Sequence, residues 1–264
     1  MAVIFNNSDP GSHIGTLCLI YRVLRRSEGK EITISQLKDL CTPETLARNN
    51  NQTKKFNTTL DFWAGEYHKL WRVDENNTLF LLHVTESINP APEEIAKVVR
   101  DALFEEKIEI ISNNMRDNLH SIEPMFLFLS CLLSVTSHGP FDENTLDKES
   151  ISKTLTAWLG SLNSLNNSEL PNVIPWLLFL GFLNISGEDV VIDPTKVVKD
   201  ELVHIFTHSN EIPIRMFVEA VADRVPVLDG GHYQQQTVKV MRQNNWQYDY
   251  EKNISSSLSL ALHR

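Results

Sequence analysis

The stretch Leu70-Trp-Arg-Val-Asp-Glu-Asn-Asn-Thr-Leu-Phe-Leu81 contains two short apolar runs on either side of a polar turn. The runs from Leu70 to Val73 and from Thr78 to His83 have the composition of short strands. Between them, Asp74 to Asn77 supplies residues that favour a tight reversal of the chain. The stretch therefore predicts a β-hairpin.

Three helices are predicted before this hairpin. Apolar residues recur at helical spacing in residues 13–27, in Ile34 to Leu40 and in a run from Phe56 to Tyr67. Thr33 is the predicted N-cap of the second helix. Three helices followed by a two-stranded hairpin is the order of a winged helix. Residues 1–90 are therefore interpreted as one winged-helix unit.

The same order recurs about 112 residues further along the chain. Phe182-Leu-Asn-Ile-Ser-Gly-Glu-Asp-Val-Val-Ile-Asp193 again places a polar turn between two apolar runs. Three predicted helices precede it: Pro124 to Val135, Ser150 to Leu162 and Leu170 to Phe182. We interpret the recurrence as a diverged internal duplication. The predicted fold is mainly α with short β-hairpins, an α+β chain of tandem winged-helix (helix-turn-helix) units.

The domain boundaries follow from this order. Residues 1–90 form the first winged-helix unit, residues 91–119 contain a connecting helix, and residues 120–195 form the second unit, which is acidic. Residues 196–264 carry further predicted helices, the last of them from Ile254 to Arg264. A wing usually follows a recognition helix, and none follows this one. The third winged-helix-like unit is therefore predicted to be incomplete, and the chain to continue past Arg264.

The net charge of −10 argues against a general polyanion binder, but the charge is unevenly distributed. Residues 1–90 contain ten Lys and Arg and ten Asp and Glu, and residues 196–264 contain eight of each kind. Residues 91–195 contain six basic and sixteen acidic residues, and so carry the whole excess. A nucleic acid is therefore repelled by the middle of the chain and accepted more readily by either end.

The expected location of the protein follows from signals that the sequence lacks. The N-terminus has no basic region followed by an apolar run, so no secretory signal is predicted. The longest apolar runs, Met125 to Val135 and Val173 to Leu183, are shorter than the roughly 20 residues that span a bilayer. Cys18, Cys41 and Cys131 are interpreted as buried thiols in a reducing compartment. The chain is expected to be cytoplasmic and to have no membrane contact.

The sequence contains no nucleophile elbow, phosphate-binding loop or paired zinc-ligand motif. His204 and His208 are four residues apart on a predicted helix but have no third ligand nearby. The acidic segment from Asp142 to Glu149 is more simply a solvated loop than a nuclease site. We therefore expect no catalytic residue, no metal site, no cofactor and no small-molecule substrate.

The polar segment 48–58 is the first candidate for contact with nucleic acid, because a helix-turn-helix unit places the front of its recognition helix there. Asn and Gln recognise adenine edges, and Lys and Arg hold phosphates and guanine. The candidate residues are Arg48, Asn51, Gln52, Thr53, Lys54, Lys55, Asn57 and Thr58. The alternative is a solvated loop followed by an ordinary helix cap. Three arginines of the first predicted helix either flank the DNA backbone or solvate the helix end: Arg22, Arg25 and Arg26.

A second candidate for contact with nucleic acid lies near the C-terminus. Lys239 and Arg242 precede the last predicted helix, and Ser255 and Ser257 open it. Short hydroxyls at a helix N-terminus suit contact with a phosphate. Ser255 is equally suited to be a plain N-cap.

Three stretches near the C-terminus carry a family resemblance: Phe217-Val-Glu-Ala-Val-Ala-Asp-Arg-Val-Pro-Val-Leu-Asp-Gly-Gly231, Trp246 onward, and Ser255-Ser-Ser-Leu-Ser-Leu-Ala-Leu-His-Arg264. Over residues 213–264 the chain resembles DpdG, a component of bacterial islands that insert deazapurine bases into DNA and restrict unmodified DNA. These motifs are structural, so the resemblance implies no active site. It implies a place in a DNA modification and restriction (antiphage) system.

Two functions remain open at this point. The first is a non-catalytic tandem winged-helix component that binds double-stranded DNA within a multi-protein defence complex. The second is an assembly adaptor, whose winged helices bind other proteins of the complex and not DNA. An effector enzyme is the least favoured alternative, because the sequence supplies no residues for it. A contiguous positive surface built from residues 48–58 favours the first function, and its absence favours the second.

Overall fold

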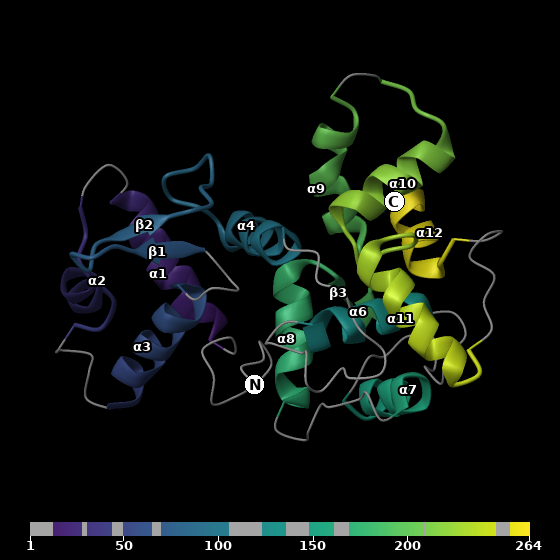
Figure 1. Ribbon diagram of the computed structural model, residues 1–264, viewed down its shortest axis with the longest axis horizontal. Helices are drawn as coiled ribbons and strands as arrows, with labels where there is room; N and C mark the ends of the chain where they lie inside the picture. The colour runs from purple at the N-terminus through teal and green to yellow at the C-terminus, as the bar shows by residue number, and fades with distance from the viewer. Residues whose placement is uncertain are drawn as a thin grey trace. The chain divides into compact units, whose positions relative to one another are not determined.

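The computed structural model describes residues 13–27, 31–43, 50–64, 70–105, 123–135, 148–160, 169–207, 210–246 and 254–264. These residues are mainly helical and include two small antiparallel strand pairs, which confirms the α+β class (Figure 1). Within them, no helix is long and apolar enough to cross a membrane. The chain forms two compact units, an N-terminal unit of residues 2–105 and a C-terminal unit of residues 106–264. The division into three winged-helix units stays a prediction.

Apolar residues at helical spacing build the core of the N-terminal unit. The first helix buries Leu17, Tyr21 and Leu24 on the side that packs against the second and third helices. Thr33 caps the second helix, as predicted, because its hydroxyl accepts a hydrogen bond from the Gln36 backbone N–H at 3.3 Å. The unit contains, in chain order, α1 (Ile14–Arg26), α2 (Ile34–Cys41), α3 (Asn50–Ala64), β1 (Trp71–Val73), β2 (Leu79–Leu81) and α4 (Pro92–Phe104).

Strands β1 and β2 form the predicted hairpin. They pair antiparallel, with Trp71 opposite Leu81. In the turn between them, the Asp74 carboxylate accepts hydrogen bonds from the backbone N–H groups of Asn76 at 2.9 Å and Thr78 at 2.8 Å. The turn is therefore held by one of its own side chains, which confirms the interpretation of its polar residues.

A short extended segment before α2 adds to this hairpin. The Leu79 backbone N–H donates to the Ile32 carbonyl at 3.0 Å, and Thr33 forms an antiparallel bridge with Thr78. β2 therefore lies between residues 32–33 and β1. The chain order of the unit up to β2 is a helix, a short extended segment, two helices and a hairpin.

Helix α3 is joined to the hairpin by hydrogen bonds as well as by packing. Leu60 and Trp63 of α3 are buried. The Trp71 indole N–H donates to the Leu60 carbonyl at 3.0 Å, and the Leu70 backbone N–H donates to the Trp63 carbonyl at 3.1 Å. Because α3 begins at Asn50, the described part of the polar segment is helical and not a solvated loop.

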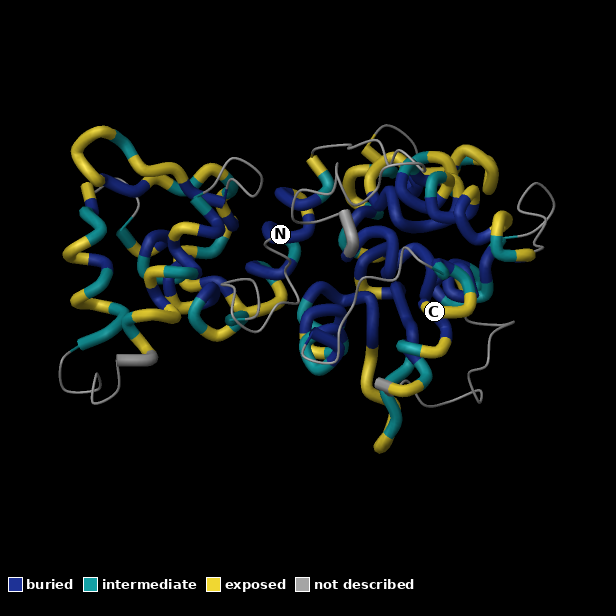
Figure 2. Tube along the Cα trace, turned by 60° about the horizontal axis from the view of Figure 1, so that its bottom comes forward, coloured by how far each residue is buried: buried dark blue, intermediate teal, exposed yellow. Residues whose placement is uncertain are grey.

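One core built on α6 holds the C-terminal unit together. All the residues from Met125 to Val135 are buried, and α6 packs against α7, α11 and α12. Buried stretches of the chain are dark blue in Figure 2. The rings of Phe126 and Tyr233 stack with their centroids 4.3 Å apart. Helices from both sides of position 195 therefore share this core. The described elements are α6 (Glu123–Val135), α7 (Lys148–Leu159), α8 (Leu170–Leu180), β3 (Leu183–Ser186), β4 (Asp189–Ile192), α9 (Thr195–Ile205), α10 (Ile214–Arg224), α11 (His232–Gln243) and α12 (Ser256–His263).

Strands β3 and β4 form the second predicted hairpin. Leu183 lies opposite Ile192, and Ser186 lies opposite Asp189. Two residues make the turn, and Gly187 at its first position has a φ of 67°. A turn of this length needs that left-handed conformation, which glycine adopts without strain.

The three cysteines are free thiols. Cys18 and Cys131 are buried and Cys41 is half-buried, close to the prediction of three buried thiols. Burial raises the pKa of Cys18 to about 11 and the pKa of Cys41 to about 12, and it also raises the pKa of Cys131. All three therefore stay protonated at neutral pH, which is the unreactive form of the side chain.

Trp63 and Trp176 are core side chains, with exposed fractions of 0% and 1%. We expect Trp63→Ala and Trp176→Ala each to lower the free energy of unfolding by roughly 3–5 kcal/mol, because each change leaves a cavity. Urea denaturation measures this loss. The control, Ile88→Ala, changes a side chain that is 64% exposed and should alter stability by about 0.5 kcal/mol or less. A loss as small as the control's would contradict the core role of either tryptophan.

Candidate nucleic-acid interface

Helix α3 has one closed face and one open face. Its closed face is formed by side chains with exposed fractions of 3% or less: Phe56, Thr59, Leu60 and Trp63. On the opposite side, residues at positions i, i+3, i+4 and i+7 share one face, and we call them the outer stripe of α3: Lys54, Asn57, Thr58 and Asp61. Lys54, Asn57 and Asp61 are exposed, whereas Thr58 is half-buried. The Thr58 hydroxyl donates to the Lys54 carbonyl at 2.9 Å.

Lys55 lies to one side of the outer stripe, close to the start of α1. Partial burial lowers the pKa of His13, and the Lys55 ammonium group lowers it further. His13 directly precedes α1 and makes no side-chain cap hydrogen bond. Because the N-terminal end of a helix carries a partial positive charge, Lys55 and α1 together create positive potential beside the outer stripe.

Most of the first predicted site lies on the open side of α3. Gln52, Lys54, Lys55 and Asn57 are exposed, and Thr53 and Thr58 are half-buried. Asn51 lies in the first turn of α3, and Arg48 lies outside the described residues.

Asp61 is a member of the outer stripe that the sequence interpretation missed. It follows Lys54 by seven residues, and residues at i and i+7 share a helix face. This spacing could have found it once α3 was known to begin before Lys54.

The hairpin that packs on α3 carries charges of both signs. On β1, the exposed Arg72 guanidinium lies over the Phe80 ring, 5.0 Å from its centroid. In the turn, the Asp74 carboxylate holds the backbone and Glu75 is exposed. Two carboxylates repel phosphates from the turn, so Arg72 is the part of the hairpin that suits a polyanion.

Three arginines of α1 bind the segment between β2 and α4. The Nε–H of Arg22 donates to the Pro90 carbonyl at 2.9 Å, and the Nε–H of Arg25 donates to the Thr85 carbonyl at 3.0 Å. Arg26 donates to a side chain of the same segment at 2.6 Å. Neither predicted role describes Arg25, which is buried, whereas Arg26 is exposed in the last turn of α1 and both of its predicted roles stay predictions.

Ser255 and Ser257 lie inside the C-terminal unit, with exposed fractions of 3% and 1%. The Ser255 hydroxyl donates to the Asp229 carboxylate at 2.6 Å and accepts from the Leu258 backbone N–H at 3.2 Å, as the N-cap of α12. The Ser257 hydroxyl donates to the Leu133 carbonyl of α6 at 2.8 Å. Ser255 is therefore the N-cap of α12. Because both serines are buried and hydrogen-bonded within the unit, their hydroxyls are not exposed for contact with DNA.

Lys239 and Arg242 are exposed on α11, which also packs against α6. The Lys239 ammonium group lies 3.5 Å from the side-chain oxygen of Gln236. Because Ser255 and Ser257 are buried, the second predicted site is reduced to two exposed cations without an accompanying helix terminus.

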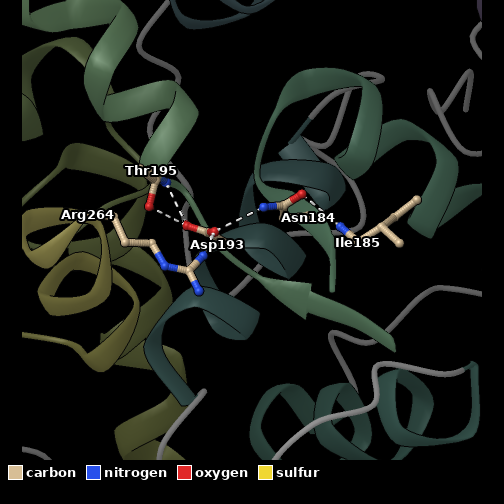
Figure 3. Close-up of polar contacts among 5 residues, drawn as sticks. All are labelled: Asn184, Ile185, Asp193, Thr195 and Arg264. Carbon is tan, nitrogen blue, oxygen red and sulfur yellow. Dashed lines mark hydrogen bonds and ion pairs between the residues drawn. The ribbon is translucent and has the colours of Figure 1, made fainter. Parts of the chain in front are cut away.

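Arg264, at the end of α12, is bound close to the end of the second hairpin (Figure 3). Its guanidinium forms an ion pair with Asp193, which directly follows β4. Asp193 also accepts hydrogen bonds from the Thr195 backbone N–H at 3.1 Å, from the Thr195 hydroxyl and from the Asn184 side-chain amide at 3.4 Å. With Ser255 bound at its other end, α12 is anchored within the C-terminal unit at both ends.

The sequence analysis expected no metal site and considered one pair of histidines, His204 and His208. Among the residues that the structure describes, no group of three or more His, Cys, Asp or Glu side chains could hold a metal ion. His204 is exposed on α9, and His208 lies outside the described residues. The expectation for this pair stays a prediction.

Asp193 provides a pH-dependent test of the anchor. Burial raises the pKa of its carboxyl, but hydrogen bonds from Thr195 and Asn184 and the Arg264 guanidinium outweigh burial and hold the pKa below its ordinary value of 3.8. A depressed folded-state pKa stabilises the fold above the unfolded pKa, and this contribution is lost as the pH falls through the folded-state pKa. The loss of unfolding free energy in Asp193→Asn should therefore be largest near neutral pH and shrink below about pH 4.

Urea denaturation of the parent and Asp193→Asn over a series of pH values measures this difference. The control is Asp223→Asn, at an exposed carboxylate of the same unit, which should change stability by about 0.5 kcal/mol or less throughout. A difference for Asp193→Asn that stays constant as the pH falls would show that the ionised carboxylate does not anchor α12.

Lys55→Glu should raise the pKa of His13. A neighbouring cation disfavours the imidazolium ion, and a carboxylate in its place favours it. Titration of the histidine ring by NMR measures the change. Lys54→Glu is the matched control, because Lys54 lies on the outer stripe and should shift the pKa of His13 less. Equal shifts in the two variants would contradict the position of Lys55 beside α1.

Comparison with known proteins extends the resemblance noted in the C-terminal sequence. No curated protein and no solved structure matches the chain. One family model matches residues 1–264, and its match therefore covers both compact units. The chain belongs to the DpdG-like family.

Proposed function

We propose that this chain is a non-catalytic component of a deazapurine DNA modification and restriction system, and that its N-terminal unit binds double-stranded DNA. Membership of the DpdG-like family supports the place in such a system. The observation that carries the DNA contact is the open face of α3, where the exposed Lys54 and Asn57 stand opposite a closed apolar face.

The order of elements in the N-terminal unit supports a winged-helix assignment. Residues 32–33 pair with β2, and the hairpin of β1 and β2 follows α3. In a winged helix, the helix before the hairpin enters the major groove, and the hairpin is the wing. Under this assignment α3 is the recognition helix.

The exposed residues of α3 have the chemistry that this contact requires. Lys54 and Lys55 can neutralise phosphates, which supplies much of the affinity and makes it depend on salt. Gln52 and Asn57 can form the paired hydrogen bonds that distinguish adenine from other bases. Because the core closes the opposite side of α3, a duplex approaches the helix from the side of the outer stripe, which carries Lys54 and Asn57. Gln52 precedes the buried Phe56 by four residues and so lies at the start of α3, toward its closed face.

The distribution of charge favours the N-terminal unit for contact with DNA. Residues 2–105 contain 12 basic and 14 acidic residues, whereas residues 106–264 contain 12 basic and 20 acidic residues. Exposed charges are screened over about 8 Å at physiological ionic strength, so a duplex responds to the charges nearest to it. Near Lys54 and Lys55 those charges are mainly positive, whereas the acidic excess of the C-terminal unit repels phosphates.

An adaptor role is the second candidate function, and the C-terminal unit supports it. Its last helix, α12, is anchored in the core and does not present a terminus to DNA. Large apolar side chains are instead exposed on α9 and α10, with exposed fractions of 69%, 65% and 56%: Val203, Ile214 and Met216. Exposed apolar residues on an acidic unit suit contact with other proteins of a multi-subunit complex.

Lys54→Glu combined with Lys55→Glu should abolish binding to duplex DNA. Phosphate contacts govern the affinity and its salt dependence. The melting temperature should hardly change, because exposed charge changes alter stability by about 0.5 kcal/mol or less. Fluorescence anisotropy with a labelled duplex, repeated over a series of salt concentrations, measures both the affinity and its salt dependence.

The matched control is Lys239→Glu combined with Arg242→Glu, which makes the same change of net charge on exposed residues of the C-terminal unit. This control should keep its affinity for DNA. Unchanged affinity in the α3 variant rejects the site. Equal losses in both variants indicate that net charge, and not α3, governs binding. If the parent protein binds no duplex even at low salt, DNA binding is rejected and the adaptor role is favoured.

A further inference from the structure

We propose that Asp61 is a specificity-determining residue of this interface, whose carboxylate accepts a hydrogen bond from an amino group in the major groove. The inference rests on the proposed function, because it requires α3 to lie in that groove. The donor is the N4 amino group of cytosine or the N6 amino group of adenine, since these are the amino groups that the major groove displays.

The geometry of α3 brings Asp61 to any duplex that Lys54 and Asn57 contact. The three side chains are exposed on one face, and the buried opposite face prevents the helix from turning about its axis. Lys54 and Asp61 are seven residues apart, which is about 10.5 Å along a helix axis. Since base pairs are spaced by about 3.4 Å, the outer stripe extends over about three of them.

A carboxylate at this position discriminates between bases because it can only accept hydrogen bonds. Phosphates repel it, and guanine presents only the acceptors O6 and N7 to the major groove. Removing water from the charge without a new hydrogen bond is unfavourable. An amino donor replaces the lost water contact. Asp61 therefore weakens binding to most DNA sequences, but not to those that place cytosine or adenine opposite its carboxylate.

The Asp61 side chain has no competing role in the part of the chain that the structure describes. Within those residues, no hydrogen bond or ion pair engages its carboxylate. Two other acids of the N-terminal unit differ in this respect. Asp74 holds the hairpin turn, and Glu94 accepts a hydrogen bond from the Ala91 backbone N–H at 2.8 Å at the start of α4. The Asp61 carboxylate is therefore available to a ligand.

The test uses the full chain and begins with selection of bound duplexes from a random-sequence pool. Affinity is then measured for the parent, Asp61→Asn and Asp61→Ala on duplexes that differ from the preferred site at one base pair. The informative changes are C to T and A to G, because each replaces an amino donor with a carbonyl acceptor at one place in the groove. Melting temperatures of the variants confirm that each is folded.

The parent should lose about tenfold or more in affinity on one of these changes. Asp61→Ala should lose this discrimination at that base pair alone, and should bind other sequences more tightly than the parent because a repulsive charge is gone. Sensitivity to C to T identifies cytosine as the partner, and sensitivity to A to G identifies adenine. The control is Asp39→Ala, which removes an exposed carboxylate from α2 and should leave the discrimination intact.

Two results overturn the inference and leave the proposed function standing. In the first, Asp61→Ala keeps the discrimination of the parent at every base pair. In the second, both Asp61 variants lose affinity equally for all sequences, which indicates that Asp61 positions α3 and does not recognise a base. A parent protein that binds no duplex DNA overturns the proposed function and the inference together.

Discussion

The packing of one face of α3 is the constraint on which the candidate interface depends. Leu60 and Trp63 are buried, and the Trp71 indole donates to the Leu60 carbonyl, so both the rotation of α3 and the position of the hairpin are fixed. The burial of the opposite face of α3 therefore orients the outer stripe, and the side chains of the stripe need no contacts of their own for this. Lys54 and Asp61 face outward together because the other side of their helix cannot leave the core.

Helix α1 supports this arrangement, because it packs against both α3 and β2. The Tyr21 hydroxyl donates to the His83 carbonyl at 2.9 Å and accepts from the Thr85 backbone N–H at 3.1 Å. Arg25 donates to the Thr85 carbonyl. Backbone N–H and C=O groups in the segment after β2 therefore have hydrogen-bond partners within the unit. Basic residues of α1 therefore serve the fold, and the count of cations in the N-terminal sequence exceeds the number available to DNA.

A similar distinction applies to the acidic residues of the C-terminal unit. Asp193, Glu201 and Asp229 are buried, and each is engaged within the unit: Asp193 with Arg264, Glu201 with Arg224, and Asp229 with Ser255. These carboxylates join α9, α10 and α12 and contribute nothing to the surface that a partner meets. The unit thus combines internal ion pairs with an exterior that includes exposed apolar side chains, which is compatible with protein contacts more than with contact with a polyanion.

Local patterns were sufficient to predict most of the helices, both hairpins and the polar residues of α3, because apolar spacing and turn chemistry are properties of neighbouring residues. Lys54 and Asn57 were found in this way, and Asp61 was missed because the candidate segment was taken to end at residue 58. The burial of polar side chains was not predictable from such patterns. Ser257 looked like a phosphate ligand at a helix N-terminus, but its hydroxyl bonds to Leu133, 124 residues away. Contacts between residues so distant in the sequence decide which polar groups reach the surface, and only the packing of α12 on α6 reveals them.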